Sequence, residues 1–254
     1  MRSLFHHRAS EHPPLVEPVP NSFPRIEGAE IGAAFSGKRV GGDFFDAFRA
    51  NPQRILFGML DVAGRREDIR GILSAAQDIF RNRGTELFSA VDINEADAMT
   101  ELCLELNRGV IDAASGVHSC PAFVACYHEQ FGTLCYTNAG HIPALLRDRS
   151  GISELASTGL PLGLFSHATC DAPIEGLEKG AALLVVSRGV VECGGDHDKS
   201  SQEFGLKRVQ DSFAEVPRSG AQELCTRILN AASEFSPLTA LCDDRTALAF
   251  VRLG

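Results

Sequence analysis

Four short runs of mostly apolar residues constrain the fold more than any other feature of this sequence. They span positions 55–60, 122–127, 181–186 and 246–251. A half-exposed β-strand alternates apolar and polar residues, whereas a strand covered on both faces is apolar throughout. Each run therefore predicts a strand that is buried on both sides. None of the runs approaches the ~18 apolar residues that a membrane-spanning helix needs.

Three segments with helical periodicity are expected to cover these strands. Apolar residues recur every three or four positions over 69–80, 99–110 and 221–232, which predicts one buried face on each helix. Box-like start signals at Asp92–Glu95 and Ser219–Gln222 predict where the second and third helices begin. Because the strand runs come in groups rather than in strict alternation with helices, we expect an α+β sandwich with helices packed outside the sheets.

The composition limits the classes of partner. Hydrophobic residues make up 44% of the 254 positions, which is ample for one core, and 24 Lys and Arg stand against 33 Asp and Glu, for a formal net charge of −9. An acidic chain lacks the basic face that nucleic acids and anionic membranes require. The N-terminus also lacks the apolar stretch of a secretory signal. We therefore expect a cytoplasmic protein with no nucleic-acid or membrane partner.

The N-terminal segment differs in composition from the rest of the chain. Residues 1–24 contain five of the 12 prolines and three of the 8 histidines. This composition predicts an extended or disordered lead-in. No second linker or repeat follows, so we expect one domain over residues 25–254.

The 8 cysteines include no pair spaced as Cys-x-x-Cys. Most lie inside apolar runs, where cysteine behaves as a small hydrophobic residue, so we expect buried reduced thiols. A Cys nucleophile is the alternative, with His118 two residues before Cys120.

Carboxylates stand where the apolar runs stop. Asp43 and Asp46 follow a pair of glycines, Asp61 directly follows the run at 55–60, and Asp243 and Asp244 precede the run at 246–251. Oxygen ligands at the ends of central strands suit a hard divalent cation such as Mg²⁺ or Mn²⁺. Turns favour Asp for conformational reasons as well, so it is the joint arrangement, rather than any single acid, that indicates a metal site.

Six motifs occur in a fixed order along the chain. They are GGDFFD at 41–46, LDVAG at 60–64, NAGHIP at 138–143, GLPLG at 159–163, LLVVSRGVVE at 183–192 and DDRT at 243–246. In this order they resemble the SpoIIE/RsbU-type branch of the PPM (PP2C-like) Ser/Thr protein phosphatases. The resemblance covers about residues 26–252 and implies a PP2C-like α-β-β-α sandwich, with two central, mostly antiparallel sheets and a metal site at one end.

The resemblance also implies roles for individual residues. Asp61 would bridge two Mg²⁺ or Mn²⁺ ions, the Val62 carbonyl and Asp43 would serve one of them, and Asp243, with Asp244 beside it, would serve the other. A water activated by the metal would attack the phosphorus of phosphoserine or phosphothreonine. The implied substrate is a phosphorylated regulatory protein, such as an anti-sigma-factor antagonist.

Arg188 departs from this pattern, because the family usually has a metal-ligating Asp at this position. A guanidinium cannot ligate a metal. Arg188 would pair with Asp243 in place of the second ion, bind a phosphoryl oxygen, or point to solvent from a turn. Loss of the second ion favours a pseudophosphatase that binds a phosphoprotein or signalling partner without turnover, whereas phosphoryl binding favours an altered phosphatase with one or two ions.

Three further features stay open at the level of sequence. Arg65 and Arg66 replace a Gly-rich turn after the Asp61 motif, and either face an acidic phosphoprotein or form a solvated turn. His141 is the only histidine inside the motifs, and either contacts substrate or holds its own loop. Self-association as a homodimer is also open. The candidate catalytic residues are therefore Asp61, Arg188 and His141.

Overall fold

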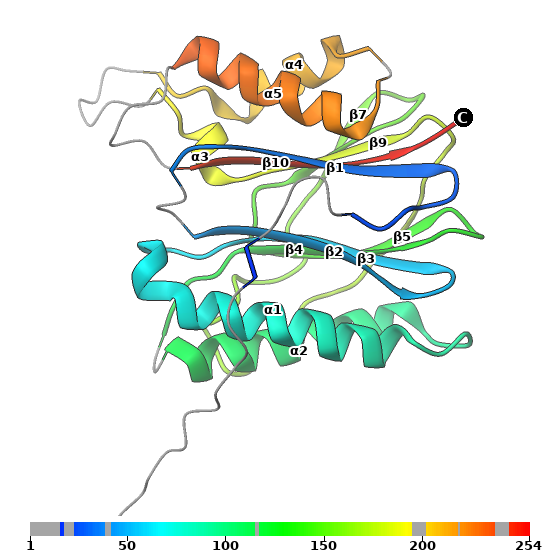
Figure 1. Cartoon of the computed structure of the whole chain (residues 1–254), viewed down its shortest axis with the longest axis vertical. Helices are drawn as coiled ribbons and strands as arrows, with labels where there is room; N and C mark the ends of the chain where they lie inside the picture. The colour runs from blue at the N-terminus through cyan, green and yellow to red at the C-terminus, as the bar shows by residue number, and fades with distance from the viewer. Residues whose placement is uncertain are drawn as a thin grey trace, which may run out of the picture.

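A computed structural model describes residues 16–17, 23–38, 42–114, 117–194, 202–217, 219–236 and 244–254. This part of the chain forms four layers, with helices outside two β-sheets that pack face to face (Figure 1). The helices are α1 (Arg66–Phe88), α2 (Glu95–Ala114), α3 (Arg188–Val191), α4 (Gly205–Glu215) and α5 (Ala221–Phe235). The strands are β1 (Ala29–Ser36), β2 (Asp43–Asn51), β3 (Arg54–Asp61), β4 (Ala122–His128), β5 (Thr133–Ala139), β6 (Ala144–Arg147), β7 (Ile152–Leu155), β8 (Ile174–Gly176), β9 (Ala182–Val186) and β10 (Arg245–Arg252).

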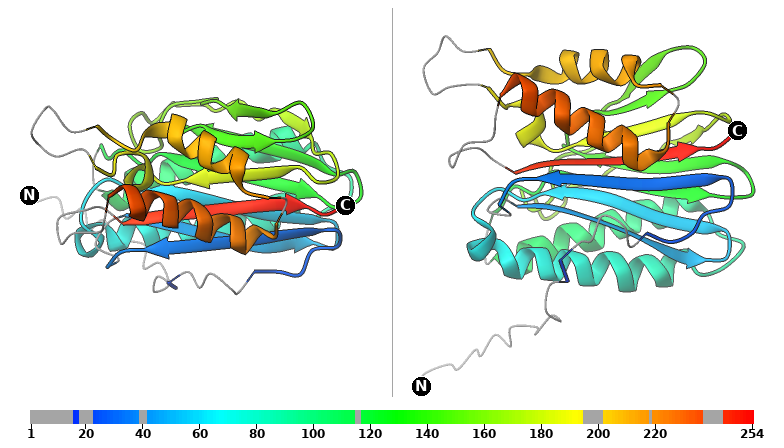
Figure 2. Two further views of the ribbon diagram at one scale, coloured as in Figure 1. Left: turned by 90° about the horizontal axis from the view of Figure 1, so that it is seen from above. Right: turned by 45° about the horizontal axis from the view of Figure 1, so that its top comes forward.

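The two sheets have the strand orders β1-β10-β9-β6-β7 and β2-β3-β4-β5-β8. Every pairing between these strands is antiparallel. Helices α1 and α2 cover the second sheet, and α4 and α5 lie over the first, as the right view of Figure 2 shows. The predicted α+β class and the α-β-β-α sandwich with two antiparallel sheets are therefore confirmed.

The four apolar runs are strands β3, β4, β9 and β10, and they lie in the middle of the sheets. Alternate residues of β3 face different cores. Leu56 packs towards α1 and α2, whereas Phe57 packs between the sheets and stacks on Phe250 of β10, with ring centroids 5.4 Å apart. Burying a side chain of this size stabilises the fold by about 1.5–3 kcal/mol. Because each of these strands faces a hydrophobic core on both sides, its apolar residues do not alternate with polar ones.

The two predicted helix start signals are wrong, although the helices are present. At the start of α2 it is Asn94 Oδ1, not Asp92, that accepts a backbone hydrogen bond, from Ala96 at 3.1 Å. Glu95 instead forms a buried ion pair with Arg54, at 2.6 Å. Helix α5 likewise begins without a side-chain cap. Glu95 and Gln222 thus make tertiary contacts in place of the predicted capping contacts, since the Gln222 side chain donates to Ala33 O at 2.8 Å.

Most of the predicted lead-in lies outside the described residues. Val16 is described, and its backbone forms two hydrogen bonds with the side-chain amide of Gln77 on α1, at 2.8 and 3.0 Å. Phe23 packs on Phe45, with centroids 6.1 Å apart. These parts of the segment therefore contact the domain, and the boundary at residue 25 stays a prediction. Of the described helices, none combines the length and the apolar character needed to cross a bilayer.

Candidate metal centre

Asp43 and Asp61 face each other at one end of the second sheet. Asp43 is the first residue of β2 and Asp61 is the last residue of β3, and the antiparallel register makes them direct partners. Directly opposed residues on neighbouring strands project to the same face of a sheet. Both residues are 7% exposed. The strand ends thus bring together two acids that are 18 positions apart in the sequence.

These two carboxylates are electrostatically incompatible without a cation. Burial, the charge of Asp61 and, to a smaller extent, the charge of Asp244 together raise the pKa of Asp43 to about 7. Hydrogen bonds to Asp43 oppose this rise, including one that Thr246 Oγ1 donates at 2.7 Å. Two neighbouring buried carboxylates cannot both ionise cheaply. A divalent cation would remove this cost, so the donor set fits one.

The described residues supply donors for one hard ion rather than a closed cage. Among them, no three His, Cys, Asp or Glu side chains gather closely enough to hold a metal. Mg²⁺ commonly retains several waters and uses only one or two protein carboxylates. Asp43 and Asp61, with the nearby Val62 carbonyl, match that requirement.

The Val62 carbonyl is positioned by close contact with Gly42. Val62 N–H donates to Gly42 O at 3.2 Å, and a Cβ added at Gly42 would lie 1.8 Å from Val62 O. Only glycine lets the two backbones approach this closely at the mouth of the candidate site.

Gly42→Ala is expected to destabilise the protein by about 1–3 kcal/mol, because the added methyl group must push Val62 away. Urea unfolding measures this change. Gly71→Ala is the matched control: Gly71 lies on an exposed part of α1 with no atom within 4 Å of an added Cβ, and the substitution should stabilise the helix by about 0.5–1 kcal/mol. Equal unfolding free energies for the two variants would contradict this account of Val62.

The two acids at the start of the last strand have different outcomes. Asp243 lies outside the described residues. Asp244 is 2% exposed and accepts a hydrogen bond from the backbone N–H of Lys38 at 2.9 Å. Its carboxylate therefore ties the end of β1 to the start of β10, close enough for its charge to act on Asp43. A metal-binding role for either acid remains a prediction.

Arg188 lies beside Asp61. It opens α3, its backbone N–H donates to Asp61 Oδ2 at 3.3 Å, and its guanidinium Nη2 is 3.9 Å from Asp61 Oδ1. Its Nε is 3.8 Å from Glu192, and its side chain is 47% exposed. The side chain is therefore neither free in solvent nor sealed in the core. It places a partly exposed cation against the acid predicted to bridge the metals.

His141 is buried near the same acid. Its backbone N–H donates to Asn138 Oδ1 at 2.8 Å, and its ring Nδ1 lies 3.1 Å from Ile142 O. Burial lowers the pKa of His141, against the raising effects of the Ile142 hydrogen bond and the Asp61 charge. Burial therefore disfavours the protonated ring, and the ring hydrogen-bonds within its own loop.

Two residues of the site were not assigned from the sequence, although both lie in the six motifs. Thr246 donates to Asp43, and Ser187 also hydrogen-bonds to Asp43. The backbone N–H of Thr246 in turn donates to Ser187 Oγ at 3.0 Å. The sequence signal that could have identified them is their position: Ser187 directly precedes Arg188, and Thr246 closes the DDRT motif.

The alternative Cys nucleophile is wrong. Cys120 is fully buried, and burial raises the pKa of its thiol well above the ordinary value. His118 Nε2 lies 2.6 Å from Ala63 O, so this nitrogen donates to a backbone carbonyl and is not the one that would accept a proton from Cys120. The seven cysteines in the described part of the chain are free and buried, as expected. Arg65 is exposed at the start of α1.

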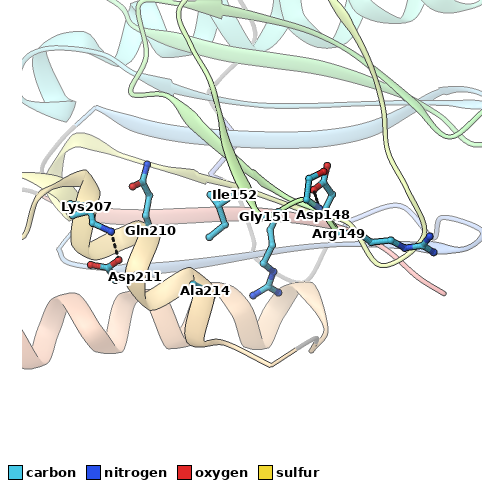
Figure 3. A pocket seen from close by; sticks show the side chains of 10 residues that line it. Asp148, Arg149, Gly151, Ile152, Lys207, Gln210, Asp211 and Ala214 are labelled. Atoms are coloured by element: carbon cyan, nitrogen blue, oxygen red, sulfur yellow. Dashed lines mark hydrogen bonds and ion pairs between the residues drawn. The ribbon is translucent and has the colours of Figure 1, made fainter.

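A cavity of about 500 Å³ between the β6–β7 hairpin and α4 is separate from this site (Figure 3). None of the candidate site residues lines it. The charged side chain of Lys207 in it is paired with Asp211, at 2.5 Å. We therefore assign no role in phosphoester chemistry to this cavity.

Comparison with known proteins links this architecture to bacterial phosphatases. The family model of Stage II sporulation protein E (SpoIIE) matches residues 51–252. Phosphoserine phosphatase RsbP of Bacillus subtilis (strain 168) is 25% identical over 179 residues, which are 70% of this chain and 42% of RsbP.

Solved structures share the fold. The RsbU and RsbW domains of Rv1364c from Mycobacterium tuberculosis match with a TM-score of 0.71 and 24% identity, over 91% of this chain and 62% of that one. The PP2C phosphatase domain of SpoIIE from Bacillus subtilis, with a fragment of its regulatory domain, matches with a TM-score of 0.69 and 14% identity, over 90% and 64% of the two chains. This chain thus spans less than two thirds of the length of each relative named here.

Proposed function

Because this chain belongs to the SpoIIE family, in the SpoIIE/RsbU-type branch of the PPM phosphatases, we propose that it hydrolyses phosphoserine or phosphothreonine on a regulatory protein in a metal-dependent reaction. The observation that carries the proposal is the buried pair of opposed carboxylates, Asp43 and Asp61. Two buried carboxylates this close repel each other and destabilise the fold. A bound divalent cation would offset that repulsion, so a metal site explains why both acids are present.

Asp43, Asp61 and the Val62 carbonyl would hold one Mg²⁺ or Mn²⁺ ion. When bound, such an ion lowers the pKa of a water and offsets the charge on the phosphoryl oxygens. Asp243 and Asp244 would serve a second ion, but Arg188 occupies the position of one of that ion's usual ligands. We therefore assign a single ion to this protein.

Arg188 would supply the missing positive charge. Its guanidinium is half exposed and 3.9 Å from Asp61, so a phosphoryl group approaching Asp61 meets it. A planar fork of N–H donors can hold two phosphoryl oxygens at once. Arg188 would then orient the substrate, while water protonates the leaving seryl oxygen.

The partner we propose is a phosphorylated signalling protein in the cytoplasm, of the kind of an anti-sigma-factor antagonist. The name of RsbP describes a phosphoserine phosphatase, which supports this substrate class. The free buried cysteines suit a reducing compartment. A homodimer is compatible with this assignment and is not required by it.

A pseudophosphatase is the second candidate, and the Arg188–Asp61 contact is the observation that favours it. A cation fixed beside Asp61 competes with a metal ion for the same carboxylate. In that case the protein would bind its phosphorylated partner without hydrolysing it.

Metal-dependent hydrolysis of p-nitrophenyl phosphate distinguishes the two functions. The purified protein in Mn²⁺ is expected to exceed its own rate in EDTA by at least about 10²-fold, since the ion supplies several kcal/mol of charge stabilisation. A folded protein that shows no such difference, yet binds a phosphoserine peptide, would be a pseudophosphatase.

A further inference from the structure

The imidazole of His141 is held in one tautomer. Its Nδ1 lies 3.1 Å from the carbonyl oxygen of Ile142, and a carbonyl can only accept a hydrogen bond. Nδ1 must therefore carry the proton, and in the neutral ring Nε2 then carries a lone pair. The backbone N–H of His141 donates to Asn138 Oδ1 at 2.8 Å, which fixes the backbone that carries the ring.

Nε2 is a buried acceptor without a donor. His141 is only 4% exposed, and its Nε2 has no hydrogen-bond partner among the described residues. An unsatisfied buried acceptor costs about 1–3 kcal/mol, and such groups in native proteins generally serve a ligand, an ion or a water. Asp61 lies near enough for its charge to favour the protonated form of the ring, although burial has the larger effect on the pKa of His141.

The backbone next to His141 is held by a close contact with a second motif. A Cβ added at the neighbouring Gly140 would lie 2.4 Å from Pro161, and Gly140 has a φ of +66°. Only glycine readily adopts this conformation. The GLPLG motif thus packs against the NAGHIP motif at the residue before His141.

We propose that His141 Nε2 accepts a hydrogen bond from the attacking water at Asp61 and aims its lone pair at phosphorus. This inference rests on the proposed phosphatase function and assigns the role of one atom within it. His141 is then a catalytic residue, because it touches the reacting water. Asp61 and Arg188 bind the other participants, and His141 fixes the direction of attack.

Two substitutions separate this role from loop support. His141→Asn keeps a donor near the position of Nδ1 and removes the acceptor, whereas His141→Gln places an amide oxygen near the position of Nε2. We expect His141→Asn to lower kcat for p-nitrophenyl phosphate roughly 10²-fold with little change in KM, as misdirected attack does. His141→Gln should recover at least roughly 10-fold of that loss. Calorimetric Mn²⁺ affinity should be unchanged in both variants.

The tautomer itself can be measured without turnover. Nitrogen NMR of the wild-type protein is expected to show His141 neutral with the proton on Nδ1, and Mg²⁺ should shift the Nε2 resonance. His128 is the control: it is also buried, with an unpartnered Nδ1, but lies at the opposite end of β4, so Mg²⁺ should leave it unchanged.

Different failures point to different assignments. A proton on Nε2, or wild-type kcat in His141→Asn, overturns the role of His141 while the phosphatase stands. A higher kcat in His141→Asn than in His141→Gln would show that His141 only supports its loop. A wild-type protein without metal-dependent hydrolysis removes the proposed function, and the role of His141 falls with it.

Discussion

Asp61→Asn is expected to abolish metal-dependent hydrolysis, with a loss of at least about 10³-fold, and to abolish Mn²⁺ binding as well. Asn has nearly the same shape as Asp but no charge, so the substitution removes a ligand without opening a cavity. A phosphatase that relies on the ion to activate water and to offset phosphoryl charge loses both effects together. Calorimetric titration with Mn²⁺ and initial rates with p-nitrophenyl phosphate measure the two losses.

The same substitution should not destabilise the metal-free protein. Asp61 is the second-largest cause of the raised pKa of Asp43, so removing its charge relieves a repulsion between two buried groups. The substitution also weakens the ion pair with Arg188. Because the Arg188 side chain is half exposed, this pair contributes little to the free energy of unfolding. Urea unfolding in EDTA should therefore give Asp61→Asn a free energy of unfolding equal to or above the wild-type value. If the inactive variant is at least as stable as the wild-type protein, Asp61 is retained for its chemistry rather than for its contribution to stability.

Asp46→Asn is the matched control, because Asp46 lies on the same strand as Asp43 and undergoes the same chemical change. Its carboxylate pairs with Arg81 at 2.6 Å instead of facing Asp61. It should keep wild-type Mn²⁺ affinity and activity while losing about 1 kcal/mol of stability. Full activity in Asp61→Asn, or an equal loss in Asp46→Asn, would show that the acids have been assigned to the wrong roles.

The fold was predictable because its strongest signal is local. Strands β3 and β10 are buried at nearly every position and apolar along their middle because two cores enclose them, and this apolar run is visible in the sequence. Helix starts were not predictable by the same means. Glu95 fits a capping box, yet it serves as the buried partner of Arg54, 41 positions away. A local pattern cannot tell which of two uses a side chain will have.

The sequence indicates which acidic residues belong to the site, but not how their side chains are arranged relative to one another. That Asp43 opposes Asp61 depends on the register of β2 and β3, and a one-residue slip would have turned one of them to the other face. The roles of Thr246 and Ser187 depend on contacts between the two sheets, which no spacing reveals. Arg188 was visible as a departure, but its position beside Asp61 follows from the turn between β9 and α3.

Arg188→Asp is expected to raise the Mn²⁺ stoichiometry from one ion to two per chain. The substitution changes the local formal charge by −2, which is equal and opposite to the +2 charge of the ion that we infer the wild-type site does without. It places a carboxylate where a guanidinium now contacts Asp61, and oxygen ligands are what Mg²⁺ and Mn²⁺ require. Activity should rise or fall with the balance between a gained ion and a lost phosphoryl contact, so stoichiometry is the decisive measurement.

Two control variants isolate the ligand from the charge. Arg188→Ala removes the cation without adding a ligand, and should leave one ion per chain while raising KM for p-nitrophenyl phosphate by roughly 10-fold, the value of one charged contact. Arg227→Asp makes the same −2 change on the exposed face of α5, where Arg227 pairs with Glu223, and should leave one ion and an unchanged KM. Two ions in the wild-type protein, or one in Arg188→Asp, would show that Arg188 does not stand in for a metal. Unchanged KM in Arg188→Ala would remove it from phosphoryl binding, and its contact with Asp61 would then favour the pseudophosphatase.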